Sequence, residues 1–175
     1  MPDATGLELL AQELGELVPQ GLLGTTFFRS KGALHVAPGC IRVILNALRE
    51  RGYAALASVH GVDYYPEEPR LGVHYELLDM QRVDRLTVQL RVPLHDPEVD
   101  SVTPDAADGP GWPTANHQER EVYDLFGVVF RGHPDLRRIV MPEDYEGHPQ
   151  RRDFPTGGEP VIFTHNERQF EGRPA

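Results

Sequence analysis

The sequence predicts an α+β fold, a two-layer domain with helices packed on a mixed sheet. Two amphipathic helical patterns alternate with strand-like segments in the order helix, two strands, helix, three strands. The 175 residues are 39% apolar and 25% charged, as expected for one globular domain. A short helix and an extended C-terminal tail follow. We therefore divide the chain into residues 1–92, 93–111, 112–127 and 128–175.

The first helix is predicted by leucines spaced three and four residues apart, namely Leu7, Leu10, Leu14 and Leu17. Thr5 and Glu8 before them have the spacing of a capping box. Pro19 and Gly21 end the pattern. This helix is expected to lay one stripe of leucines on the core.

The two strands of a hairpin are predicted over residues 22–29 and 33–37. The glycine of the intervening Ser30-Lys31-Gly32 is expected to supply a positive φ for the turn. A second helix is predicted between Pro38 and Gly52. Its apolar residues at helical spacing are Ile41, Ile44, Leu45 and Leu48. Cys40 at its start has no adjoining basic partner, so a buried structural cysteine is favoured over an activated thiol.

Three more strands are predicted over residues 54–62, 71–78 and 85–92. Residues 93–111 contain four prolines and five acidic residues without periodicity, which indicates an extended surface loop or linker. A short helix is predicted near 115–126, with Asn116 and Glu119 as a second capping box and Gly127 at its end. Residues 128–175 are rich in Pro and Gly, so this tail is expected to need another surface to lie on.

Composition excludes several classes of protein. The net charge of −10 argues against binding to nucleic acid. The sequence has no apolar run near the roughly 20 residues that cross a bilayer, and its first residues do not resemble a secretory signal. The cytoplasm is therefore the default expectation. One cysteine cannot supply the about four thiolates of an iron–sulfur cluster.

A metal site is the first chemical alternative. Two Gly-His-Pro triplets place His133 and His148 15 residues apart, with His117 or His165 as a third candidate ligand. Proline after each histidine favours a role in turns instead. Acid–base catalysis by Glu119, Glu121 and Asp124 is not favoured, because no nucleophile stands beside a base.

Arginines and carboxylates alternate with large apolar residues between residues 119 and 154. This composition is typical of a protein interface, and the alternative is a salt-bridged surface of the domain itself. The residues predicted to dock a partner are Glu119, Arg120, Glu121, Tyr123, Asp124, Phe126, His133, Arg137, Arg138, His148, Arg151 and Arg152.

The same segments carry a resemblance to a known family. Residues 119–127, 132–138 and 142–149, with shorter matches upstream from Val62, resemble the C-type (30-kDa-type) subunit of the proton-pumping NADH:quinone oxidoreductase, respiratory complex I. The resemblance covers about residues 54–155. The equivalent subunit of a membrane-bound nickel–iron hydrogenase or formate hydrogenlyase shares parts of the motif. A small metalloenzyme built on the histidines is a more distant alternative.

The resemblance implies a non-catalytic scaffold subunit of the hydrophilic arm. Its α+β domain is expected beside the quinone-reducing module, with its C-terminal segment along the D-type subunit of the same complex. FMN and the iron–sulfur clusters that carry electrons from NADH to quinone belong to sister subunits, so no cofactor of its own is expected. The partners implied are the D-type subunit and the neighbouring cluster-carrying subunits. The implied location is peripheral, on the cytoplasmic side of the cell membrane.

Overall fold

The computed structural model describes residues 4–104 and 110–155. Its elements are α1 (Ala4–Leu17), β1 (Leu22–Phe28), β2 (Lys31–Val36), the 3-10 turn η1 (Pro38–Cys40), α2 (Ile41–Glu50), β3 (Ala55–Asp63), β4 (Leu71–Asp79), β5 (Asp84–Val92), β6 (Glu98–Asp100), α3 (Ala115–Phe126) and β7 (Val129–Arg131). The predicted order of helices and strands is confirmed. Within the described ranges, no helix is long and apolar enough to cross a membrane.

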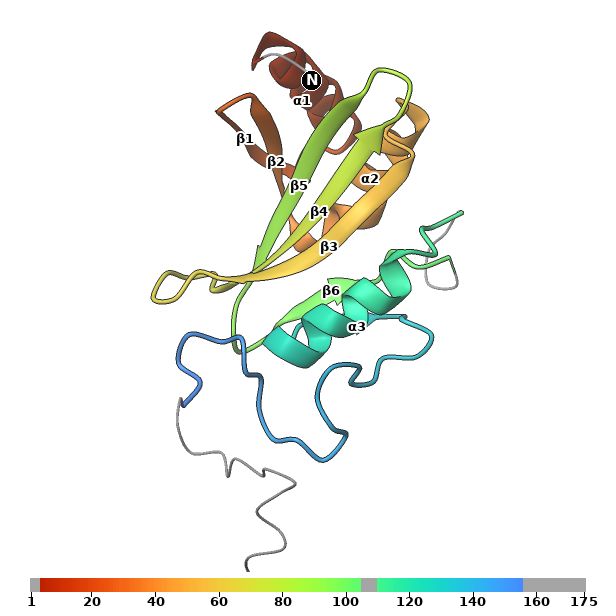
Figure 1. Ribbon diagram of the computed structural model, residues 1–175. Helices are drawn as coiled ribbons and strands as arrows, with labels where there is room; N and C mark the ends of the chain where they lie inside the picture. Colours follow the sequence, from red (N-terminus) through yellow and green to blue (C-terminus); the bar gives the residue numbers. More distant parts are fainter. Residues whose placement is uncertain (1–3, 105–109, 156–175) are drawn as a thin grey trace, which may run out of the picture.

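Five strands form one mixed sheet in the order β1-β2-β5-β4-β3. Strands β2 and β5 are parallel, and the other neighbours are antiparallel. A parallel pair needs a long crossover connection, and α2, β3 and β4 supply it here. Helices α1 and α2 lie on one face of the sheet (Figure 1). The predicted α+β fold with a mixed sheet is therefore confirmed.

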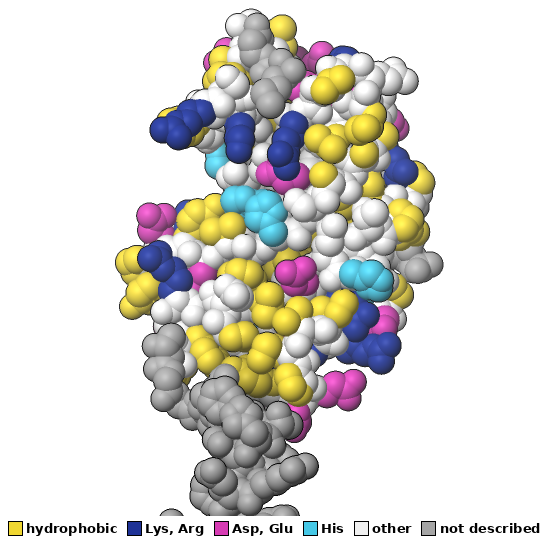
Figure 2. All heavy atoms as spheres, viewed as in Figure 1, with side chains coloured by type: hydrophobic (Ala, Val, Ile, Leu, Met, Phe, Trp, Pro, Cys, Tyr) yellow, Lys and Arg dark blue, Asp and Glu magenta, His cyan; other side chains and the backbone are white. Residues whose placement is uncertain are grey.

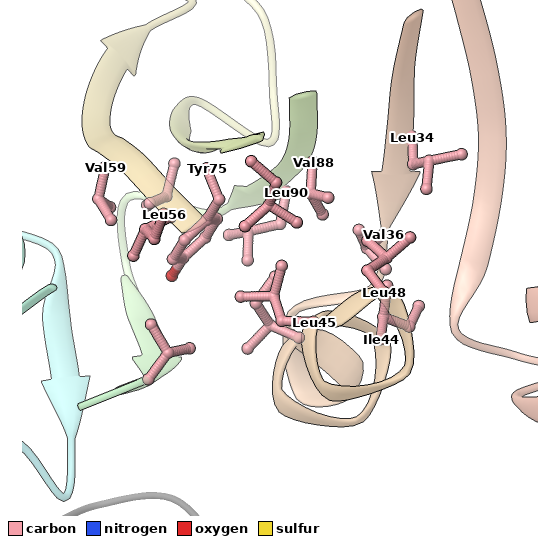
Figure 3. Packing of buried hydrophobic residues seen from close by; sticks show 14 of the residues in the cluster. Leu34, Val36, Ile44, Leu45, Leu48, Leu56, Val59, Tyr75, Val88 and Leu90 are labelled. Carbon is pink, nitrogen blue, oxygen red and sulfur yellow. The ribbon is translucent and has the colours of Figure 1, made fainter. Parts of the chain in front are cut away.

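The core lies between this sheet and the two helices. The four predicted apolar positions of α2 are all fully buried, and every second side chain of β5 points toward them. Figure 3 shows Leu45 of α2 facing Leu90 of β5, and Leu48 of α2 next to Val36 of β2. Burying a Leu, Ile or Val side chain contributes about 1.5–3 kcal/mol, so these contacts dominate the stability of the region.

The β1–β2 turn differs from the prediction. Its central residues are Arg29 and Ser30, with φ of 48° and 63°, while Gly32 lies inside β2. Two successive positive φ values are typical of the type I′ turn, whose twist matches that of a hairpin. The turn therefore falls two residues earlier than the glycine suggested.

Both predicted capping boxes are wrong, although the predicted range 115–126 of the third helix is correct. Thr5 lies within α1 and Asn116 within α3, so neither residue is an N-cap. The predicted stripe on α1 is correct for Leu7 and Leu14, but Leu17 is exposed. Pairs of polar residues three apart are common inside helices, and their spacing alone does not define a helix end.

Part of the segment 93–111, predicted to be an extended surface loop or linker, forms a short strand and is buried in the interior. It contains β6, which pairs in parallel with β7, and the residues after β6 are buried. The buried set is Val99, Ser101, Val102 and Thr103. The prediction of an exposed loop is therefore wrong for this part, and residues 105–109 lie outside the described ranges.

Helix α3 covers the free edge of β3 (Figure 1). The Gln118 side chain continues the hydrogen bonding of the sheet: its Oε1 accepts from the Val59 N–H at 2.7 Å, and its Nε2 donates to the Ala57 carbonyl at 3.4 Å. A Cβ at Gly61 would lie 2.3 Å from the Phe126 ring, so a glycine is required where the helix approaches the strand. The edge strand thereby positions α3.

Candidate partner-docking site

Helix α3 ends at Gly127, where the tail begins. Gly127 has φ of 76°, and its N–H donates to the Tyr123 carbonyl at 2.9 Å. A Cβ at this position would lie 2.3 Å from Arg151 and 2.5 Å from His148. Glycine is therefore needed for both the left-handed conformation and the close approach of the tail. The predicted end of the helix is confirmed.

The buried Asp124 carboxylate is the centre of the site. Its Oδ2 accepts three consecutive backbone N–H groups, from Ile139, Val140 and Met141, at 2.7–2.9 Å. Its Oδ1 accepts from Arg138 Nη1 at 2.6 Å. Burial alone raises the pKa of Asp124, but these donors outweigh it and the net pKa is lowered. Asp124 therefore remains charged and fixes the tail backbone to α3.

The tail also satisfies the last carbonyl groups of α3, which have no partner within the helix. His148 Nδ1 donates to the Asp124 carbonyl at 2.9 Å, and the Gln150 N–H donates to the Leu125 carbonyl at 3.1 Å. Arg151 Nε donates to the Phe126 carbonyl at 2.7 Å. Positive and N–H groups are favourable at a helix C-terminus, so this segment acts as a C-terminal cap.

Glu119 points into the interior from α3, although the sequence pattern suggested a solvated or interface position. Its carboxylate accepts from the Ser101 hydroxyl at 2.6 Å and from the Val102 N–H at 2.8 Å. Burial raises the pKa of Glu119 to about 7, because the two hydrogen bonds compensate only partly for lost hydration. The group joins α3 to the segment after β6.

His133 anchors the start of the tail to the first turn of α3. The Asp135 N–H donates to Nδ1 at 3.0 Å, so the ring proton is on Nε2, which donates to the Asn116 carbonyl at 3.1 Å. Burial lowers the pKa of His133, which favours this neutral form. Both histidines of the Gly-His-Pro triplets thus bond to backbone groups of α3. Among the described residues, no group of three or more His, Cys, Asp or Glu could hold a metal ion.

A second anchor joins the tail to the β3–β4 loop. The buried Arg70 guanidinium pairs with Asp63 at 2.7 and 2.8 Å and with Asp153 at 2.6 and 2.7 Å. The Arg152 N–H donates to Asp63 Oδ2 at 2.8 Å. These charge-assisted pairs are bidentate and therefore directional. The sequence reading missed Arg70, Asp63 and Asp153, because nothing in their spacing links residues so far apart.

The twelve predicted docking residues fall into two groups. Most face inward, and Arg120 is typical, since it donates to the Arg137 and Arg138 carbonyls at 3.1 Å. The buried or half-buried members are Glu119, Arg120, Tyr123, Asp124, Phe126, His133, Arg138, His148 and Arg151. The exposed members are Glu121, Arg137 and Arg152. Over residues 128–155 the tail thus lies on α3 and the β3–β4 loop of its own chain. The sequence had predicted that the tail needs another surface to lie on.

The inward groups leave apolar side chains exposed on the outer surface of the tail. Ile139 and Val140, whose N–H groups bind Asp124, are 42% and 58% exposed. Figure 2 shows hydrophobic side chains gathered over the lower end of the molecule, in the region of α3 and the tail. Apolar side chains on a backbone held by buried charges form a preorganised contact surface.

Comparison with known proteins identifies this architecture. The family model described as respiratory-chain NADH dehydrogenase, 30 Kd subunit, matches residues 34–160. The C-type subunit of the NADH-quinone oxidoreductase of Roseiflexus castenholzii is 44% identical over 153 residues, covering 86% of this chain and 84% of that protein. Subunit 5 of the same enzyme from Thermus thermophilus is 45% identical over 121 residues, covering 64% and 56%.

Two solved structures share the fold. A trypsin-resistant fragment of Nqo5 (1–134) has a TM-score of 0.60 and 32% identity, and the match covers 73% of this chain and 98% of the fragment. An archaeal membrane-bound sulfane sulfur reductase matches with a TM-score of 0.68 and 22% identity over 94% of this chain and 91% of the matched chain, which shows the fold alone. The chain belongs to the family of 30 Kd subunits of respiratory-chain NADH dehydrogenase. It is thus related to subunits of an oxidoreductase complex.

Proposed function

We propose that this chain is a non-catalytic scaffold subunit of the hydrophilic arm of complex I, docked to its neighbours through α3 and the tail. One observation carries the proposal: buried Asp124 holds residues 138–141 so that Ile139 and Val140 face outward. A protein with no partner gains little from exposing apolar side chains on a rigid backbone.

Within this proposal the chemistry belongs to other subunits. They pass electrons from NADH through FMN and iron–sulfur clusters to quinone and couple this transfer to proton translocation. The sequence supports this division, since its one cysteine cannot supply the about four thiolates of a cluster. The partners proposed, following the resemblance of the sequence motifs, are the D-type subunit and the neighbouring cluster-carrying subunits. The location proposed on the same ground is peripheral, on the cytoplasmic side of the cell membrane.

Assembly of the complex tests the proposal. Arg138→Ala should release the subunit, because the variant leaves Asp124 buried without its ion pair and frees the backbone that presents Ile139 and Val140. Arg138→Lys should restore assembly only partly, since an ammonium group cannot bond both Asp124 and the Gly147 carbonyl as the guanidinium does. NADH:quinone activity of purified membranes should fall in proportion to the lost subunit.

Arg137→Ala is the matched control, because Arg137 is exposed and pairs only with the exposed Asp135 among the described residues. Its assembly should change little. Full assembly of Arg138→Ala would contradict the docking role. The subunits that copurify with the tagged chain identify its host complex. NADH-oxidising subunits would support complex I, whereas nickel–iron hydrogenase subunits would show that the chain belongs to the related hydrogenase complex.

A further inference from the structure

The sheet has a second face that none of the described helices covers. Helices α1 and α2 lie behind the strands, and α3 lies beside the edge strand β3 (Figure 1). Polar and small side chains alternate with the core residues on this open face, for example Thr87 and Gln89 of β5. A hollow of about 300 Å³ lies on it, lined among others by Thr26, Phe28, Lys31, His35 and Glu76.

Positive charge collects at the end of this hollow nearest the β1–β2 turn. Lys31 and Arg85 line this end together with one carboxylate, Glu76, which is already bonded by Arg85 at 2.8 Å and by the Thr87 hydroxyl at 2.9 Å. Arg29 of the adjoining turn lies over the ring of Phe28, which lines the hollow. No carboxylate within the described ranges forms an ion pair with Lys31. Three cations and one anion leave a local charge of +2 on a chain whose net charge is −10. Figure 2 faces this side and shows Lys and Arg side chains gathered over its upper part.

His74 and His35 on this face have lowered pKa values and so do not add to this charge at neutral pH. Burial lowers the pKa of His74 to about 4, with help from the neighbouring His60. Burial and the Arg91 charge also lower the pKa of His35. The positive charge of the patch therefore rests on the arginines and the lysine.

The turn that carries two of the cations is preorganised. The positive φ values of Arg29 and Ser30 define a tight hairpin turn. Phe28 before it is 66% exposed, and the Arg29 guanidinium lies 5.1 Å from the centre of its ring. An exposed aromatic ring beside arginine is the composition found at the centre of interfaces.

We propose that this end of the open sheet face docks a carboxylate-bearing segment of another subunit, with acidic side chains against Arg29, Lys31 and Arg85. The proposal rests on the assembly of this chain into the complex and adds a second contact surface, on a different layer from α3 and the tail. Charge complementarity favours this occupant, because the cationic side chains attract carboxylates at short range and pair with them in the contact. The exposed ring of Phe28 supplies the apolar part of the contact.

Lys31 makes the test specific, because it is the single lysine of the chain. Apart from the amino terminus, a zero-length carbodiimide can join an amine of this subunit to a carboxylate only through Lys31. In the purified intact complex we expect an isopeptide bond between Lys31 and an Asp or Glu of another subunit, found by mass spectrometry. Acetylation of Lys31 by a water-soluble succinimidyl ester should be at least about tenfold slower in the complex than in the free subunit, because an interface excludes water and reagent.

Lys31→Arg is the control for the cross-link, since it keeps the charge and removes the reactive amine. Lys31 acetylated equally fast in the free and assembled subunit would overturn the proposal. The proposal would also be overturned if Lys31 were protected from acetylation but formed no cross-link to a carboxylate of another subunit. A cross-link to another copy of this chain would overturn it as well. Failure of the subunit to copurify with any complex would instead refute the proposed function, so the two failures are distinguishable.

Charge reversal gives an independent measurement. Lys31→Glu should weaken association of the free subunit with a complex lacking it by about tenfold or more at low salt, and the loss should shrink as salt is raised. The matched control is the double variant Gln12→Glu/Gln20→Glu, at two exposed positions in and just after α1, which changes the net charge by the same two units away from this face. Equal weakening by both variants would show a nonspecific effect of net charge and contradict the specific contact.

Discussion

The two parts of the molecule are held together by different forces. Helices α1 and α2 bury an almost wholly apolar layer against the sheet. Helix α3 adds apolar residues such as Val122 to the same core, but the tail is joined to α3 and to the β3–β4 loop largely by the charges of Asp124, Arg70 and Asp63. Glu119 joins α3 to the segment after β6. Apolar burial is nondirectional and tolerates change, whereas paired charges fix position but fail when one partner is removed. The first part supplies stability, and the second supplies a defined surface.

The largest loss is expected for Arg70→Ala, which tests the charged part. The variant leaves the Asp63 carboxylate, 2% exposed, without its guanidinium partner. Removal of one partner of a buried pair typically costs about 3–5 kcal/mol. Urea denaturation should show this loss, and hydrogen exchange should show faster opening at the Arg152 and Phe154 amides. If Arg70→Ala lowered the free energy of unfolding no more than removal of an exposed arginine does, the distinction between the two parts would fail.

The apolar part is tested by Leu45→Ala. Leu45 is fully buried between α2 and the sheet, so truncation should reduce the free energy of unfolding by about 2–5 kcal/mol. Amide protection in the tail should fall only as far as global stability falls. Leu9→Ala, on the exposed side of α1, should change stability by less than about 0.5 kcal/mol. Selective release of the tail in Leu45→Ala would show that the two parts are not independent.

Glu119 should make the stability of the chain depend on pH. Its pKa is about 7 in the folded protein, against 4.5 for an unperturbed glutamate, so between these values the folded state holds a proton that the unfolded chain has released. The free energy of unfolding therefore falls as pH rises through this window, by roughly 2–3 kcal/mol at about 1.4 kcal/mol per pKa unit. Glu119→Gln should remove this slope in denaturation curves between pH 4.5 and 7.

The control for this prediction is Glu121→Gln, which alters an exposed carboxylate on the same helix. Its slope should match that of the unaltered protein. A slope that persists in Glu119→Gln would assign the pH dependence to other groups and remove the role given to this buried carboxyl.

The smallest effect is expected for Arg137→Ala. Arg137 is 62% exposed at its side chain and pairs with Asp135, itself 48% exposed. Such surface pairs contribute about 0–1 kcal/mol. Thermal unfolding of the isolated subunit should therefore change little. A loss comparable to that of Arg70→Ala would show that exposure does not separate the anchoring arginines from the surface ones.

Most of the apolar part could be predicted from the sequence, and little of the charged part. Leu45 and Leu48 repeat with the period of a helix, and alternation along β5 defines a buried face, so local pattern carries the information. Nothing local tells that Glu119 points inward while Glu121 points outward. That distinction depends on β6 and the Ser101 hydroxyl, which the helix meets only in the folded chain.

The predicted docking residues were chosen by composition rather than by geometry. Alternating arginine and acid correctly drew attention to Asp124 and Arg138, but the pattern did not reveal that they pair within the chain. Arg70 lacked any such pattern, because its partner Asp153 lies in the tail. Pairing between distant segments is set by the fold, which a single sequence does not display.

The Arg70 anchor also implies an order of folding. Asp153 is separated from Arg70 by 83 positions, and closing an unstructured loop of that length costs about 4 kcal/mol of chain entropy before any constant term. The anchor becomes favourable only after β3, β4 and α3 have brought its two ends close together. The tail therefore docks last, on a chain whose earlier layers are complete. If a neighbour binds the tail as proposed, a half-folded subunit presents no finished contact surface, and such binding would select chains that have completed their folding.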